Sequence, residues 1–284
     1  MLLEKLFTVY VYFQTLWCGC AADRKHAGFL VNEPKYRVEK TGRMAKKQVK
    51  ESSGLELAPD NITFWTHADS GNPPQLYQVN SRGQLLNTFA IPQTTNLDWE
   101  DVAKDDLGYL YIGDFGNNSN SRQNLRIYRI KENNFAQVDT ISFVYPDQKA
   151  FPPVKAKQNF NCEAFFYFRN KLYLFSKNRG TRGWVKMYTL PAQPGTYTAS
   201  LTDSLKIASR ITAADISPDG QTIALLGYGN IYLYSTDAAG SFFAGKKNCL
   251  AIPATGQAEA ILFINNHELI ISNEGGKLFR IAKK

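Results

Sequence analysis

The sequence predicts an all-β fold, namely a single β-propeller with five blades around one axis. Four-residue stretches that resemble one another recur at intervals of about 50 residues, a spacing typical of propeller blades. A short strand-like run follows each stretch and ends in polar residues and glycine. The last repeat is short of one strand, which predicts that another part of the chain completes it. The five stretches are Ser52–Leu55, Trp99–Val102, Cys162–Phe165, Ala213–Ile216 and Ala258–Ile261.

The composition agrees with a globular β domain and gives no sign of nucleic-acid binding. The chain has 284 residues, of which 44% are hydrophobic and 13% aromatic, enough for a substantial core. The net charge of +8 is concentrated in residues 24–50, which hold nine basic and two acidic side chains. Because residues 51–284 are nearly neutral, a solvated basic arm is favoured over an arm that binds nucleic acid. We expect a monomer without a nucleic-acid partner.

The amino terminus predicts export. Leu6–Trp17 is a 12-residue apolar run, shorter than the roughly 20 residues that span a bilayer but suited to a signal peptide. It ends in Trp17-Cys18-Gly19-Cys20, which resembles a bacterial lipobox and predicts lipidation of Cys20. The alternatives are an ordinary secretory signal and a leader lengthened by a misassigned start codon. The expected parts are a signal peptide at 1–20, a linker at 21–34 and the propeller at 35–284, with membrane attachment only through the lipid.

The remaining cysteines and the histidines predict no zinc site. Cys162 and Cys249 are expected in different blades, too far apart for a disulfide, as buried free thiols. His26, His67 and His267 are isolated from one another and from cysteine pairs.

Turn signals divide the chain into five units of short strands. Segments such as Asn80-Ser81-Arg82-Gly83 and Pro218-Asp219-Gly220 have strong turn chemistry. The first unit is predicted at 53–57, 62–67, 75–79 and 85–91, and the second begins at Asp98 with further strands at 109–113, 125–130 and 140–145. The third begins at Asn161 with strands at 171–176, 185–190 and 201–208. The fourth begins at Ile211 with strands at 222–226 and 231–235, and the fifth at Gln257 with strands at 268–272 and 277–281.

The fifth unit needs a fourth strand, and Tyr36–Lys40 is predicted to supply it. This segment alternates as a strand does and precedes the first innermost strand. Closing the ring in this way removes two exposed sheet edges. The interval between the second and third units is lengthened around Asp147–Gln158, which predicts an inserted loop, with a cramped sixth blade as the alternative.

Polar residues at equivalent positions of the blades predict a metal site on the axis. The start of an innermost strand and the end of the second strand share one face of a propeller, so their polar residues meet at one mouth of the channel. Crowded carboxylates repel one another, and oxygen ligands suit Ca²⁺. The predicted ligands are Glu100, Glu163 and Glu259, with help from Asp98, Asp101 or Asp114.

Each of these acids also has a structural interpretation. A recurring carboxylate can accept backbone N–H groups, and Asp-x-Gly-Asn endings are turn formers. For the three glutamates the metal interpretation is favoured, because Ser53 and Ala214 are assigned to the same register without a charge. Asp69, Asp215 and Glu274 are expected at the same mouth.

His67 and a basic loop are further candidates at this mouth. His67 is a candidate general base or ligand, although a hydrogen-bonded structural histidine is the simpler interpretation. Lys177, Arg179 and Arg182 belong to one loop that either binds a phosphate or carboxylate or is merely solvated. The sequence contains no nucleophile elbow, phosphate-binding loop, zinc-protease helix or Rossmann fingerprint.

Four segments of the first two units form a recognisable pattern: Glu51-Ser52-Ser53-Gly54-Leu55, Asp98–Ala103, Tyr111–Asn118 and Ile127-Tyr128-Arg129. The pattern resembles the exported propellers of the SdiA-regulated type, which are distantly similar to NHL-repeat and esterase-like phytase propellers. The resemblance covers most of the chain beyond residue 50 and implies five blades, a bound calcium ion and no established activity. By more distant analogy, lactonase and phosphotriesterase propellers hold Ca²⁺ on the axis, but a shared fold does not transfer function.

Two functional classes remain open. The first is a non-enzymatic propeller of the cell envelope that binds calcium and presents its mouth to a ligand or protein partner. The second is a Ca²⁺-dependent hydrolase of an ester, lactone or phosphoester at the mouth of the channel, in which a carboxylate or His67 activates water.

Overall fold

The structure is a computed structural model of the whole chain. It describes residues 20, 28–31, 36–45, 47–49, 51–177, 184–207, 209–236, 242–243, 245–252 and 254–284. Among these residues no helix is long and apolar enough to cross a membrane.

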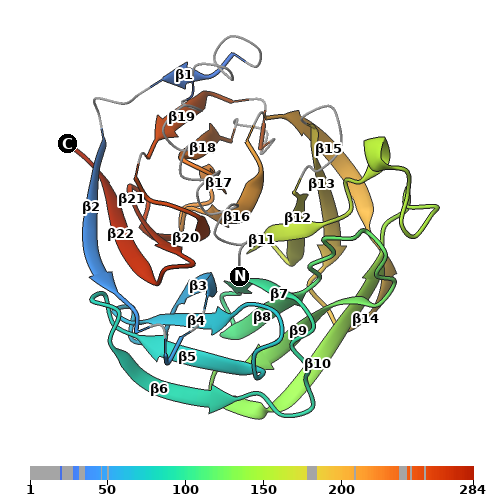
Figure 1. Cartoon of the computed structure of the whole chain (residues 1–284), viewed down its shortest axis with the longest axis horizontal. Coiled ribbons are helices and arrows are strands. Elements are labelled where there is room, and N and C mark those ends of the chain that lie inside the picture. Colours follow the sequence, from blue (N-terminus) through green and yellow to red (C-terminus); the bar gives the residue numbers. More distant parts are fainter. Residues whose placement is uncertain are drawn as a thin grey trace, which may run out of the picture.

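Five β-sheets surround one central axis, which confirms the predicted five-bladed propeller (Figure 1). The sheets are separate blades, and each contributes one strand to the wall of the channel. These innermost strands are β3 (Ser52–Leu57), β7 (Trp99–Lys104), β11 (Cys162–Phe168), β16 (Ile211–Ile216) and β20 (Ala258–Asn265). Each packs against the innermost strands of the two neighbouring blades, so the ring is closed.

The outer strands follow in antiparallel order within each blade. In the first two blades they are β4 (Phe64–Ala68), β5 (Gln75–Val79), β6 (Leu85–Ala90), β8 (Tyr109–Asp114), β9 (Leu125–Lys131) and β10 (Asn134–Val144). In the third and fourth they are β12 (Lys171–Ser176), β13 (Trp184–Pro191), β15 (Ser200–Lys206), β17 (Thr222–Gly227), β18 (Asn230–Ser235) and β19 (Lys247–Ala251). The fifth has β21 (Glu268–Asn273) and β22 (Lys277–Lys283).

An amino-terminal strand closes the ring as the sequence predicts. β2 (Tyr36–Arg43) pairs antiparallel with β22 and becomes the outermost strand of the fifth blade. Tyr36 lies opposite Lys283, so the two distant parts of the chain form one hydrogen-bonded ladder. This pairing covers the edge of β22 that the last repeat would otherwise leave open.

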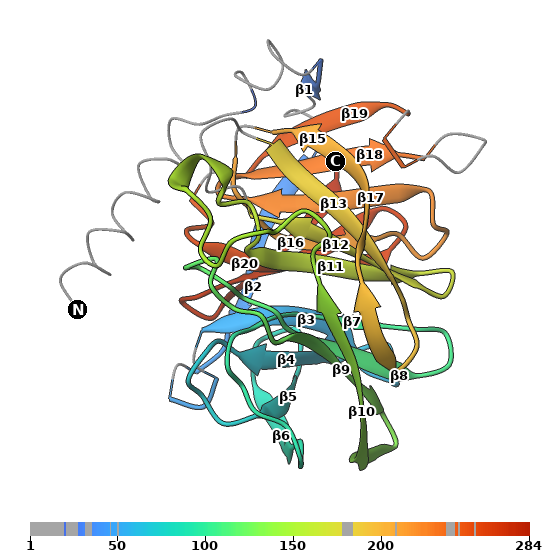
Figure 2. The same cartoon turned by 90° about the vertical axis from the view of Figure 1, so that its right-hand side faces the viewer.

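Two short edge strands were not predicted. β1 (Leu30–Val31) pairs parallel with β19, within the segment that was expected to be a linker. β14 (Gly195–Thr198) leaves its own blade and pairs parallel with β10 of the preceding blade. Residues between β10 and β11 form a loop with one 3₁₀ turn, η2 (Lys155–Lys157), and no sixth blade. In the side view this loop lies on the face of the ring from which β11 starts (Figure 2).

Cys20 forms a disulfide with Cys249 of β19, with the two Cα atoms 5.6 Å apart. Phe29 packs nearby, with its ring centroid 5.3 Å from that of Tyr232. The expectation that Cys249 is a free thiol is therefore wrong, whereas Cys162 is a buried free thiol as expected. A thioether-linked lipid would use the sulfur of Cys20, so lipidation and this disulfide exclude each other.

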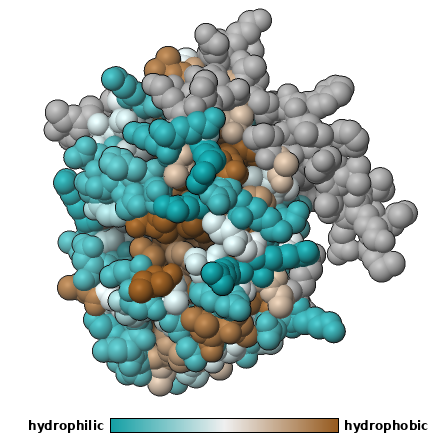
Figure 3. Space-filling view, turned by 90° about the vertical axis from the view of Figure 1, so that its left-hand side faces the viewer, coloured by the Kyte–Doolittle hydropathy of each residue, from teal (hydrophilic) through white to brown (hydrophobic). Residues whose placement is uncertain are grey.

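The apolar core lies between adjacent blades. One cluster, for example, joins Ile127 and Phe143 of the second blade to Phe165 and Leu174 of the third. The surface in Figure 3 is largely hydrophilic, with separate apolar areas between the polar side chains.

All five innermost strands carry a register shift at the same place, near their start. The residues at this bulge are Ser53, Glu100, Glu163, Thr212 and Glu259. The shared register of the three glutamates is therefore confirmed, but the alignment of the fourth repeat is wrong by two residues. Thr212, not Ala214, occupies the bulge, because Ile211 and Ala213 flank the shift.

Candidate metal centre

The three bulge glutamates belong to one crowded group of carboxylates at the mouth of the channel. Burial raises the pKa of Glu100 well above its ordinary value, and the charges of Glu163 and Asp98 raise it further. Burial likewise raises the pKa of Glu259 to about 7, with Lys177 opposing the shift and Glu163 adding to it. These mutual effects show that residues from three blades share one electrostatic environment.

Asp69, Asp98 and Glu100 form the tightest part of this group. One carboxylate oxygen of each lies within 4.8 Å of the others. Asp69 directly follows β4, whereas Asp98 and Glu100 lie at the start of β7, so the predicted meeting of these two strand ends is realised here. Burial, followed by the charges of Asp69 and Glu163, raises the pKa of Asp98 to about 7.

Gly116 provides the space in which two of these carboxylates lie. A Cβ atom at this position would be 2.2 Å from Oε1 of Glu100 and 2.4 Å from Oδ2 of Asp98. The Gly116 N–H donates to the backbone carbonyl of Asp98 at 3.1 Å, which holds the loop against the site. These two carboxylates, together with that of Asp69, form a donor set that fits a hard divalent cation.

Glu163 has a different partner, the buried ammonium group of Lys177. The two groups form an ion pair, and the side chain of Asn161 also donates to Glu163. Although burial alone lowers the pKa of Lys177, Glu163, Tyr228 and Glu259 together raise it well above its ordinary value. Lys177 is thus a fixed positive charge beside the carboxylates, and it lies at the mouth as predicted.

Glu259 interacts with the same lysine, whose charge opposes the rise in the pKa of Glu259. Its Oε1 accepts a hydrogen bond from the Tyr228 hydroxyl at 3.2 Å. The Tyr228 ring also lies 5.4 Å from the ammonium group of Lys177. Glu274 belongs to the same surroundings, because burial and then Glu259 raise its pKa to about 8.

Asp101 joins two blades, which corresponds to the structural interpretation of this residue. Its side chain is 1% exposed. Oδ1 accepts the Val102 N–H at 2.9 Å, and Oδ2 accepts the Phe165 N–H of the next blade at 3.2 Å. Both oxygens therefore have backbone donors, which a metal ion would have to displace.

Asp215 has the same kind of partners as Asp101. It lies three residues after the bulge of β16, whereas Asp101 lies one residue after the bulge of β7. Asp215 accepts the Ile216 N–H at 2.8 Å and the Phe263 N–H of the next blade at 2.6 Å. It lines a cavity with Glu56 that lies at the ends of the innermost strands, opposite the acidic mouth. The expectation that Asp215 lies at the acidic mouth is therefore wrong, and the misaligned fourth repeat is the reason.

Asp114 is neutralised by arginines. Oδ1 lies 3.1 Å from the guanidinium of Arg122, and Oδ2 lies 3.3 Å from that of Arg126. Oδ1 also accepts the Asp98 N–H at 3.0 Å. Asp114 thus positions Asp98 from behind and has less free negative charge to offer to a cation.

His67 is a buried histidine between two blades. Its side chain is fully buried, and its ring packs edge-on against Trp99 at 5.7 Å. A Cβ atom on Gly54 would lie 2.7 Å from its Nε2, so the ring fills the space above that glycine. Burial lowers its pKa to about 4 despite interactions with backbone groups of Ala68 and Asp101. The ring is therefore neutral at pH 7, and its packing favours the structural interpretation.

Of the predicted basic loop, Arg179 and Arg182 lie outside the described residues.

Asp69 belongs to the candidate metal centre but is not among the metal ligands that the sequence predicts. The sequence does predict its position at the mouth. Its position at the end of a second strand, shared with Asp114, was the available signal.

No family model matches the chain, and no curated protein matches it. Solved structures resemble it in fold. The PQQ-bound aldose sugar dehydrogenase from Streptomyces coelicolor is 10% identical with a TM-score of 0.53, over 88% of this chain and 99% of that one. A putative gluconolactonase is 8% identical with a TM-score of 0.50, over 88% and 92%. A chain of a nidogen–laminin complex is 14% identical with a TM-score of 0.50, over 84% and 85%. At these identities the likeness establishes the propeller fold alone.

Proposed function

We propose that this protein is an exported propeller that binds Ca²⁺ at the mouth of its channel and presents the ion to a ligand or protein partner. The observation that carries the proposal is the approach of Asp69, Asp98 and Glu100 to within 4.8 Å of one another in a half-buried site. Like charges at this separation repel, and a divalent cation between them would remove the repulsion.

The donor chemistry selects among cations. The three carboxylates offer only oxygen, and hard cations with flexible coordination prefer such donors. Zinc and copper sites usually include at least one imidazole or thiolate ligand. His67 and Cys162 are held in the packed core, away from any such role.

The mouth also supplies groups that recognise a ligand. Lys177 presents a positive charge beside the carboxylates, and the Tyr228 hydroxyl lies next to Glu259. A ligand with carboxylate, phosphate or hydroxyl oxygens would meet the cation and Lys177 together. This arrangement best supports a binding module of the cell envelope that has no catalytic activity.

Hydrolysis of an ester, lactone or phosphoester is the second candidate function. Glu259 favours it, because a carboxyl group with a pKa of about 7 is suited to accept a proton from water near neutral pH. The bound cation would supply polarisation of the substrate oxygen. The test is hydrolysis of a panel of lactones and aryl esters by the Ca²⁺-loaded protein. Activity that is lost in Glu259→Gln but kept in Asp106→Asn would support this function. No turnover by the wild type would rule it out for those substrates.

The disulfide supports export with cleavage of the leader before Cys20 rather than after it, because such bonds persist in oxidising compartments and are rare in the cytosol. We expect intact protein from its native host to contain a Cys20–Cys249 cross-linked peptide in non-reducing mass spectrometry. A lipidated Cys20 peptide would instead restore the lipoprotein assignment and contradict the disulfide.

Calorimetry tests the cation site. After treatment with chelator, the wild-type protein should bind one Ca²⁺, and the Asp69→Asn, Glu100→Gln double variant should lose at least about tenfold in affinity. The Asp106→Asn, Asp203→Asn double variant removes two exposed acids outside the mouth, which is the same change in net charge, and should bind as the wild type does. Equal binding by the double variant and the wild type would refute the site.

A further inference from the structure

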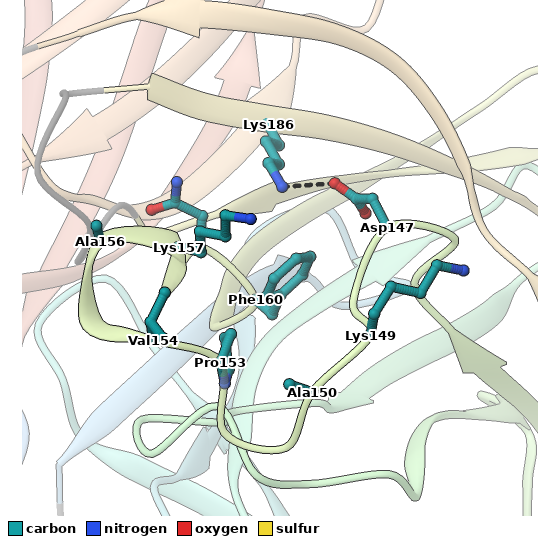
Figure 4. A pocket seen from close by; sticks show the side chains of 10 residues that line it. Asp147, Lys149, Ala150, Pro153, Val154, Ala156, Lys157, Phe160 and Lys186 are labelled. Atoms are coloured by element: carbon teal, nitrogen blue, oxygen red, sulfur yellow. Dashed lines mark hydrogen bonds and ion pairs between the residues drawn. The ribbon is translucent and has the colours of Figure 1, made fainter.

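A second cavity lies outside the acidic mouth, beneath the loop that joins β10 to β11. Its volume is about 370 Å³, within the range of small-molecule sites. Figure 4 shows the loop curving round the cavity, with Lys186 of β13 on the opposite side.

Hydrogen bonds hold both ends of this loop in place. The Phe160 N–H donates to Oδ1 of Asn120 at 2.8 Å, and the Gln148 side chain donates to the Asn120 carbonyl at 2.8 Å. Phe160 also packs against Tyr145, with ring centroids 5.6 Å apart. The cavity is therefore formed before any ligand binds, which reduces the entropic cost of binding.

One wall of the cavity is apolar. Phe160 is 3% exposed and closes one side, while Val154 is 69% exposed and stands at the rim. Pro153, Ala150 and Ala156 complete the apolar wall. A ring or a branched hydrocarbon group fits such a surface, whereas a purely polar ligand would leave it unused.

The charges at the rim are predominantly positive. Asp147 is already engaged, since its carboxylate lies 2.5 Å from the Lys186 ammonium and accepts the Tyr188 hydroxyl at 3.0 Å. Lys149 and Lys157 have no ion-pair partner among the residues that the structure describes. In Figure 4 the side chain of Lys157 extends toward Lys186.

We propose that this cavity binds a small aromatic carboxylate. The aromatic ring lies against Phe160 and the apolar wall, and the carboxylate pairs with Lys157 beside the Lys186–Asp147 pair. The Lys186 ammonium, 4.2 Å from the Phe160 ring centroid, keeps this end of the cavity positive. Such an anion avoids the mouth of the channel, where carboxylates predominate. The site is independent of the cation site and of the proposed function.

The probe for this site is 4-(trifluoromethyl)benzoate, observed by ¹⁹F NMR with the full-length protein. We expect its resonance to broaden and shift on addition of wild-type protein. The matched amide, 4-(trifluoromethyl)benzamide, has the same ring without the charge and should bind about fivefold more weakly, the upper end of the range for one exposed charge pair. Acetate at the same concentration should not displace the probe.

Charge reversal at the rim identifies the site. Lys157→Glu should weaken probe binding about fivefold or more, and the Lys149→Glu, Lys157→Glu pair should weaken it further. Lys171→Glu makes the same charge change at an exposed position on β12 outside the cavity and should leave binding unchanged. Thermal melts of each variant establish that the fold is retained. Equal binding by Lys157→Glu and Lys171→Glu, equal binding of amide and acid, or no response at tens of millimolar probe would each overturn the proposal.

Discussion

Carboxylates at two levels of the ring have different partners. At the mouth, Asp69, Asp98 and Glu100 approach one another to within 4.8 Å, and Gly116 leaves space for Asp98 and Glu100. Deeper in the ring, Asp101 accepts two backbone N–H groups, one from its own strand and one from the next blade. Burial raises the pKa of the carboxyl groups in both sets. A raised pKa therefore does not show whether a carboxylate belongs to a binding site or links two blades. The groups that it contacts, other carboxylates or backbone N–H donors, do show this.

The largest effect is expected from breaking the deeper set. Asp101→Ala leaves the N–H groups of Val102 and Phe165 without an acceptor in a site closed to water. We expect a loss of about 3 kcal/mol in the free energy of unfolding, measured with urea. Ca²⁺ should still stabilise the variant. Unchanged stability would mean that the carboxylate does not link the blades.

Removing a carboxylate at the mouth should instead stabilise the metal-free protein. Glu259→Gln removes one of several repelling charges, so in chelator at pH 8 the variant should melt at a higher temperature than the wild type.

The pH dependence of stability follows from the same repulsion. Folding raises the pKa of Glu259 to about 7 and that of Glu274 to about 8, so the folded state binds more protons than the unfolded state between about pH 4.5 and 8.

The stability of the metal-free protein should therefore be highest near pH 5 and fall as the pH rises to 8. Glu259→Gln should flatten this fall, and Ca²⁺ should largely remove it. Melting temperatures at pH 5 and 8, in chelator and in Ca²⁺, measure each of these effects. A metal-free protein that becomes more stable between pH 5 and 8 would contradict the assignment of the mouth as a repulsive site.

The sequence predicted the ring and its closure more completely than the site. Strand alternation and turn residues are local signals, so the five blades and β2 could be read from them. The partners of a carboxylate depend on the neighbouring blade, and no local pattern shows that Asp101 meets the Phe165 N–H or that Asp114 meets Arg126. The disulfide of Cys20 joins segments 229 residues apart, which spacing alone does not reveal.

The fourth repeat shows the limit of alignment by residue type. Ala213-Ala214-Asp215-Ile216 resembles the other stretches, but the bulge lies at Thr212. A shift of two residues keeps the same side chains facing inward, so the hydrophobic pattern could not expose the error.

A smaller effect is expected from crowding the mouth without changing its charge. Gly116→Ala would place a Cβ atom 2.2 Å from Oε1 of Glu100 and displace the carboxylates. We expect about a tenfold loss in Ca²⁺ affinity by calorimetry, comparable to the loss of a group that positions metal ligands. Alanine keeps the backbone hydrogen bonds of this position to Asp98 and Arg122, and the nearest atoms to the new Cβ belong to the Asp98 and Glu100 side chains, so the melting temperature in chelator should change little. Undiminished affinity would show that the cradle plays no part in binding.

Diffraction from crystals grown with Ca²⁺ tests the central claim most directly. The account predicts an anomalous peak within about 2.3–2.6 Å of carboxylate oxygens from Asp69, Asp98 and Glu100. The hydrogen bonds of Asp101 to Val102 and Phe165 should remain unchanged in the same crystals. No peak at the mouth in millimolar Ca²⁺, or a peak bound to Asp101 instead, would contradict the division between a binding mouth and a structural ring.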